Sequence, residues 1–146
     1  MALRKLLFCF ALALSPIAHA KSPIQRSHID GNVPDAKDFN EFLRRDLLAY
    51  FQVSGSSDAD ALKVQLLRDA PTQTGISYPK YYAWVRVRVG VMQIKQGAVR
   101  LVAIDKARFE VTDFVSAAQI KADLRSVENV FPSALVPGIL ERAALP

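Results

Sequence analysis

The chain has 146 residues, 51% hydrophobic and 23% charged, with a formal net charge of +5. This composition is typical of one packed domain, and it excludes a disordered, collagen-like or coiled-coil chain. Its single cysteine (Cys9) and two histidines (His19 and His28) exclude disulfide frameworks, CxxC redox pairs and zinc sites built from several cysteines or histidines.

The first 20 residues have the pattern of a signal peptide. A positive pair, Arg4 and Lys5, precedes an apolar run over residues 6–14, and Ala18-His19-Ala20 fits the small-x-small rule for cleavage. We expect cleavage after Ala20 and not a membrane anchor, because the apolar run is far shorter than the ~20 residues needed to cross a bilayer. We expect no transmembrane segment after the signal, because no later segment is long and apolar enough. The sequence therefore predicts a periplasmic or secreted protein.

Cleavage would also change the charge and the available chemistry. It would remove Cys9, His19, Arg4 and Lys5, which lowers the net charge from +5 to +3. A charge this small gives no reason to expect a nucleic-acid partner, because nucleic-acid binders concentrate more basic residues on one face. His28 would be the one histidine left.

The N-terminal third of the remaining chain predicts a tail and a helix. Residues 21–34 are polar and bounded by prolines, so we expect an extended N-terminal segment, followed by a single α+β domain over 35–146. Asp35 is a suitable N-cap for a helix. Apolar residues then recur at helical spacing: Phe39, Phe42, Leu43, Leu47, Tyr50 and Phe51.

Strands follow in the middle of the chain. Residues 62–66 alternate apolar and polar, which favours a strand, although Ser57 and Asp60 leave a short capped helix open. The best strand runs from Tyr81 to about Gln93, because the odd positions of 81–91 are all apolar while the even positions are mostly polar or aromatic. One face of this strand is predicted to pack and the other to point outward.

Two turns are predicted to return the chain. A tight turn at Gln96-Gly97 would lay residues 99–104 antiparallel to the long strand, with Val102 opposite Val91, Ile104 opposite Val89 and Arg88 opposite Asp105. A second turn near Asp105-Lys106 would add a strand over 108–113.

The C-terminal quarter predicts helices. Ser116 and Gln119 have the spacing of a capping box for a helix from Ala117 to about Ser126. A last short helix is predicted to begin at Ser133 or Pro137 and to run to Ala144.

Together these elements predict a two-layer α+β fold. A long N-terminal helix would pack on a curved antiparallel sheet of about four strands, with helices at the C-terminus. This element order resembles the cystatin-like and NTF2-like class. The resemblance lies in element order alone and no family motif is present, so no functional residue is carried over.

The outward face of the long strand holds the main candidate binding residues. It presents Tyr82, Trp84, Arg86 and Arg88, and an adjacent strand would add Arg108. The loop over residues 71–78, which holds Tyr78, is a second candidate binding region. Aromatic rings beside guanidinium groups stack on planar ligands or bind carboxylates and phosphates. The alternative is structural: Arg88 would pair with Asp105 and Arg108 with Glu110, while the aromatic residues pack under the C-terminal helices.

The leading hypothesis is an exported, non-catalytic binding protein of the bacterial envelope. We expect no cofactor and no metal, and an envelope protein or a small ligand as the partner. Two alternatives remain: a carboxylate-dependent hydrolase of envelope polymers with Glu110 or Asp113 as the general acid, and an inhibitor or immunity protein of an envelope enzyme.

Overall fold

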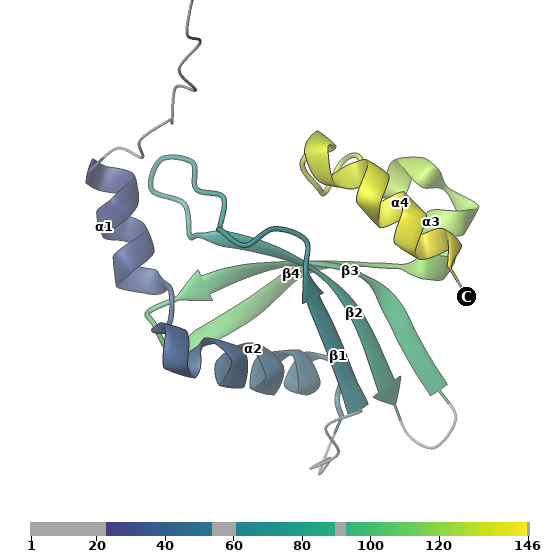
Figure 1. The fold of residues 1–146 in the computed structure, drawn as a ribbon, viewed down its shortest axis with the longest axis horizontal. Helices are drawn as coiled ribbons and strands as arrows, with labels where there is room; N and C mark the ends of the chain where they lie inside the picture. Colours follow the sequence, from purple (N-terminus) through teal and green to yellow (C-terminus); the bar gives the residue numbers. More distant parts are fainter. Residues whose placement is uncertain (1–22, 54–60, 90–92, 146) are drawn as a thin grey trace, which may run out of the picture.

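The structure is a computed structural model that describes residues 23–53, 61–89 and 93–145. The proposed signal peptide lies outside the described residues. The described part is an α+β fold with a four-stranded antiparallel sheet (Figure 1). Its elements, in chain order, are α1 (Pro23–Asn32), α2 (Ala36–Tyr50), β1 (Leu62–Leu66), β2 (Lys80–Val89), β3 (Gln93–Ile104), β4 (Arg108–Ser116), α3 (Ala117–Ala122), the short 3₁₀ helices η2 (Leu124–Ser126) and η3 (Ser133–Leu135), and α4 (Val136–Ala144).

The strands follow one another across the sheet in the order β1-β2-β3-β4, and all neighbours are antiparallel. The predicted strands at 62–66, 81–93, 99–104 and 108–113 are confirmed as elements, with small differences in their bounds. Because side chains alternate between the two faces of a strand, β2 turns its odd residues to one face and its even residues to the other.

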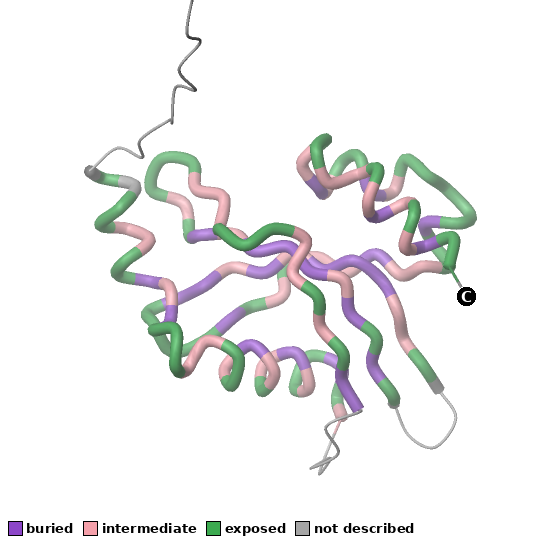
Figure 2. The backbone as a smooth tube through the Cα atoms, in the orientation of Figure 1, coloured by how far each residue is buried: buried purple, intermediate pink, exposed green. Residues whose placement is uncertain are grey.

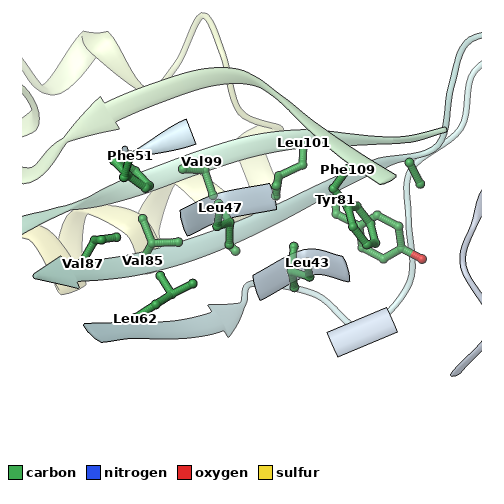
Figure 3. Close-up of a cluster of buried hydrophobic side chains, with 12 residues drawn as sticks. Leu43, Leu47, Phe51, Leu62, Tyr81, Val85, Val87, Val99, Leu101 and Phe109 are labelled. Atoms are coloured by element: carbon green, nitrogen blue, oxygen red, sulfur yellow. The ribbon is translucent and has the colours of Figure 1, made fainter. Parts of the chain in front are cut away.

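One face of the sheet packs on α2. The odd residues of β2 from Tyr81 to Val87 are buried there with Leu43 and Leu47 of the helix (Figure 3). Burial is concentrated in the middle of the sheet and on the side of α2 that faces it (Figure 2). This is the aliphatic face that the sequence predicts; its positions 89 and 91 lie outside what the structure describes of side chains.

The opposite face is partly covered by the C-terminal helices. Tyr82 of β2 and Ala98 of β3 are buried there against Ile120 of α3 and Ile139 of α4, and Trp84 is half-buried against the same cluster. Figure 1 shows α3 and α4 on the side of the sheet away from α2. The expectation that this face points wholly outward is therefore wrong, because the C-terminal helices are amphipathic and bury their apolar sides on it.

The predicted turn at Gln96-Gly97 is wrong. Both residues lie inside β3, where Gln96 pairs with Arg86 and Gly97 with Val85, so the β2–β3 connection falls at residues 90–92, outside the described residues. Gly97 is glycine for another reason: a Cβ there would lie 2.3 Å from the carbonyl oxygen of Val115. The glycine permits a close approach of β3 and β4.

The register predicted from that turn is wrong with it. Arg88 is opposite Ile94 instead of Asp105, and Val102 is opposite Lys80. The Arg88–Asp105 ion pair is therefore excluded by strand position. The second turn is confirmed: Asp105 and Lys106 both have positive φ (52° and 58°), as a tight turn between antiparallel strands requires.

The segment at 21–34, predicted to be extended, is a helix over Pro23–Asn32. Its first residue is proline, which is tolerated in the first turn of a helix. Its last residue, Asn32, is buried and fastens the helix to the β3–β4 turn: the Asn32 carbonyl accepts from the Lys106 amide (2.9 Å), and its side-chain oxygen accepts from the Asp105 amide (3.2 Å). Contacts with the rest of the fold thus stabilise this helix, whose own sequence does not predict a helix.

The remaining helices agree with the sequence. Asp35 precedes α2, although its carboxylate lies near the Lys106 ammonium (3.7 Å) instead of capping the helix. The Ser116–Gln119 capping box is present, but α3 is shorter than predicted and continues as η2. No helix in the described ranges is both long enough and apolar enough to cross a membrane.

Candidate functional site

Three strands and one helix bring polar side chains together on the face away from α2. Residues Lys63 and Gln65 of β1 are directly opposite Arg86 and Trp84 of β2. On the other side of β2, Gln96 of β3 is opposite Arg86. We name this surface the cationic groove and define it by the polar and aromatic residues that line its two cavities: Lys63, Gln65, Trp84, Arg86, Arg88, Gln96 and Arg142.

The two cavities of the groove adjoin. The larger, of about 300 Å³, is lined by Trp84 and by Arg142 of α4 among others. The smaller, of about 220 Å³, is lined by Lys63, Arg86, Arg88 and Ile94. Lys63 and Arg86 line both cavities, so the two spaces form one continuous concave surface.

All charged side chains among the described residues of the groove are cationic. Four cationic side chains line it, and among the described lining residues there is no aspartate or glutamate. Lys63 and Arg86 are directly opposite each other on adjacent strands, an arrangement that costs stability because like charges repel. An anion bound between them would remove that repulsion and accept hydrogen bonds from both.

Arg142 is held in place by its own helix and by the sheet. Its Nη1 donates to the Gly138 carbonyl at 2.9 Å, and its Nε donates to Oε1 of Gln65 at 3.3 Å. A Cβ at Gly138 would lie 3.2 Å from that Nη1, so the glycine leaves room for the guanidinium. The orientation of Arg142 is thus set before any ligand arrives, which reduces the entropy lost on binding.

Trp84 gives the larger cavity an aromatic wall. It packs on one side against the cluster under the C-terminal helices and also lines the cavity. Its opposite residue on β3 is Ala98, whose small side chain is fully buried. It is also the single tryptophan of the chain.

The structure places some of the predicted site residues in the groove and others elsewhere. It brings Trp84, Arg86 and Arg88 together in the groove. Tyr82 is 4% exposed and its hydroxyl is hydrogen-bonded to that of Thr72 (2.9 Å), so it is a core residue, as the structural alternative proposes.

Tyr78 and Arg108 lie away from the groove. Tyr78 belongs to the β1–β2 loop, where its ring stacks on that of His28 with a centroid separation of 6.1 Å. Arg108 begins β4 opposite Ile104, at the far end of β3 from Gln96. By strand alternation Arg108 lies on the same face of the sheet as Arg86 but near its other end, and neither Tyr78 nor Arg108 lines the groove.

Sequence reasoning missed four groove residues. Lys63 and Gln65 show the polar alternation of a strand, but their place beside Arg86 and Trp84 depends on the β1–β2 register. Gln96 was assigned to a turn. Arg142 reaches the groove only because α4 packs across the sheet, and no local pattern signals that contact.

The carboxylates considered for hydrolysis do not form a site with the groove. Asp113 accepts from Nε of Arg100 at 2.7 Å, and Arg100 also donates to the Val130 carbonyl at 3.1 Å. Glu110 is exposed on β4 and lines neither cavity of the groove. Within the ranges that the structure describes, no three His, Cys, Asp or Glu side chains gather as a metal site would require.

Comparison of the chain with models of protein families, with curated proteins and with solved structures finds no match.

Proposed function

We propose that this chain is an exported, non-catalytic binding protein of the bacterial envelope, and that the cationic groove recognises a negatively charged ligand. One observation carries the proposal: four cationic side chains line one continuous concave surface on which the described lining residues include no acid. Lysine and arginine side chains form strong, charge-assisted hydrogen bonds to carboxylates and phosphates.

The shape of the groove favours a small ligand over a protein partner. A concave site of a few hundred Å³ with a few convergent polar groups is typical of small-molecule recognition, whereas protein partners prefer broad and flatter surfaces. We therefore place a small ligand ahead of an envelope enzyme as the partner, and recognition ahead of hydrolysis.

Export is supported by the sequence of the first 20 residues. Their charge, apolar run and Ala18-His19-Ala20 site fit a cleaved signal peptide. Mass spectrometry of the protein recovered from a bacterial periplasm should give a chain beginning at Lys21; a chain that retains residue 1 would contradict export by this route.

We also infer that the fold is a variant of the cystatin-like and NTF2-like class. The support is the order of elements, in which the long helix α2 precedes an antiparallel sheet of sequential strands and packs on one face of it. The helices on the opposite face would be an addition that builds one wall of the groove.

The binding proposal is tested by calorimetric titration with inorganic tripolyphosphate at low ionic strength. A chain of three phosphate groups spans neighbouring cations, so the protein should bind it, and Arg86→Gln with Arg88→Gln should weaken binding at least tenfold. The matched control is Lys37→Gln with Lys121→Gln, which removes the same charge from exposed positions on α2 and α3. An equal loss in both double variants would show that net charge, and not the groove, attracts the anion.

A further inference from the structure

We propose that the ligand is an acidic sugar, with its ring against Trp84 and its carboxylate or phosphate between Lys63, Arg86 and Arg88. This inference rests on the proposed function and names the class of ligand. It follows from the different chemistry of the two adjoining cavities.

The smaller cavity has the features of an anion subsite. Three of its four described lining residues are cationic, and they come from adjacent positions on β1 and β2. Guanidinium groups match the planar geometry of a carboxylate and the oxygens of a phosphate, and the Lys63 ammonium adds a point charge. Neither Lys63 nor Arg86 forms an ion pair with another residue that the structure describes.

The larger cavity has the features of a ring subsite. It combines the Trp84 ring with two side-chain amides, Gln65 and Gln96, and with the oriented guanidinium of Arg142. An aromatic wall offers a flat apolar contact, while amides and guanidinium groups exchange hydrogen bonds with hydroxyl groups. A molecule that needs both is a ring with one apolar face and several hydroxyls, which describes a sugar better than a hydrocarbon chain.

The two subsites are close enough for one small ligand. Lys63 and Arg86 line both, and Gln65 is directly opposite Trp84 while Lys63 is directly opposite Arg86, two residues away along the same strands. Residues two apart on a strand lie on the same face about 7 Å from one another. That spacing suits a pyranose ring with its acidic group at the exocyclic position.

Trp84 makes the inference directly measurable. Because it is the single tryptophan of the chain, intrinsic fluorescence reports on the ring subsite without interference. Glucose, glucuronate and glucose 6-phosphate share one ring and differ only at its exocyclic carbon, so they form a matched series. Titrations with these three and with inorganic phosphate, at equal ionic strength, test both subsites.

We expect saturable changes in Trp84 emission with glucuronate or glucose 6-phosphate, at concentrations at least tenfold below those that glucose or phosphate requires. The stronger of the two acids identifies the acidic group as carboxylate or phosphate. Gln96→Ala should weaken the acidic sugar severalfold and leave phosphate binding, followed by calorimetry, unchanged. Arg86→Gln should weaken both.

Two results overturn the assignment to sugars while leaving the groove as an anion site. In one, inorganic phosphate binds as tightly as glucose 6-phosphate and no sugar changes the Trp84 emission. In the other, Gln96→Ala weakens phosphate and sugar equally. Failure of tripolyphosphate to bind at all overturns the proposed function itself, and glucose binding as tightly as both acids overturns the role of charge.

Discussion

At the scale of single residues, the groove brings together two like charges whose repulsion lowers the stability of the fold. Lys63 and Arg86 place two positive charges directly opposite each other, although a strand pair is stabilised when opposed charges differ in sign. Elsewhere on the same face Arg100 is paired with Asp113 and bonded to Val130, which joins β3, β4 and the C-terminal segment. Arg100 thus links elements of the fold, whereas Arg86 lines the cationic groove and is proposed to bind the ligand.

Arg86→Gln is expected to leave the free energy of unfolding unchanged or to raise it by up to about 1 kcal/mol, because it removes a like-charge contact. It should also weaken tripolyphosphate binding about tenfold. Arg100→Gln is the control and should lower the free energy of unfolding by roughly 1–3 kcal/mol, since it removes hydrogen bonds to a charged group. Urea unfolding of both variants makes the comparison; a loss above about 1 kcal/mol in Arg86→Gln would assign Arg86 a structural role.

Burial of Tyr81 in the core makes the stability of the fold depend on pH in the alkaline range. It is 4% exposed, packed edge-on against Phe39 and Phe109, and burial raises its pKa to about 12 from the usual 10. The neutral phenol is thus favoured in the folded chain, so its contribution is fully present below pH 10 and is lost as the pH rises from 10 through 12.

The prediction is that the wild-type protein loses roughly 2–3 kcal/mol more stability than Tyr81→Phe between pH 9 and pH 12. Chemical denaturation at a series of pH values measures the difference, and the Phe variant subtracts the titration of all other groups. Parallel curves for the two proteins would show that the Tyr81 hydroxyl titrates as in the unfolded chain.

At the scale of elements, the close approach of β3 and β4 depends on one glycine. A Cβ at residue 97 would lie 2.3 Å from the Val115 carbonyl oxygen and 2.8 Å from the Phe114 ring. Because the nearer atom belongs to the backbone, the strands themselves would have to move to make room. Gly97 lies between two residues beside the groove, because Gln96 precedes it and Ala98, opposite Trp84, follows it.

Gly97→Ala should destabilise the protein by about 3 kcal/mol or more, because the methyl group forces the two strands apart. Gly31→Ala is the matched control: nothing lies within 4 Å of a Cβ there and the residue is helical, so stability should rise by about 0.5–1 kcal/mol. Thermal unfolding followed by circular dichroism distinguishes the two, and equal melting temperatures would contradict the crowding at residue 97.

The same glycine shows how far sequence reasoning reaches. Alternation and helical spacing depend on neighbours in the chain, so they located α2, the four strands and the capping box of α3. A Gln-Gly pair is compatible with a turn or with a close approach of two strands, and only the long-range pairing of Gly97 with Ser116, beside the Val115 carbonyl, decides between them. The groove is predictable only in part for the same reason. The alternation of β2 places Trp84 and Arg86 on one face, whereas Arg142 reaches the groove through the long-range packing of α4 on the sheet.

At the scale of the whole molecule, the two faces of the sheet are covered differently. The face toward α2 is apolar, with Val85 and Val87 fully buried, and it forms a hydrophobic core with that helix. The other face is buried under the C-terminal helices around Tyr82 and Ala98, and beside that buried part it carries the cations of the groove. The C-terminal helices make this part of the sheet surface concave, because Arg142 of α4 and Leu145, which follows α4, form a wall beside Trp84.

We propose that anions bind at the cationic groove and not beside Tyr78 or Arg108. The most direct measurement is a titration with tripolyphosphate followed by ¹H–¹⁵N NMR at low ionic strength. The indole N–H of Trp84 and the amides of Lys63, Arg86 and Arg88 should shift together along one saturable curve, while Tyr78 and Arg108 stay in place. Shifts centred on Arg108, or spread without saturation over all cationic residues, would contradict it.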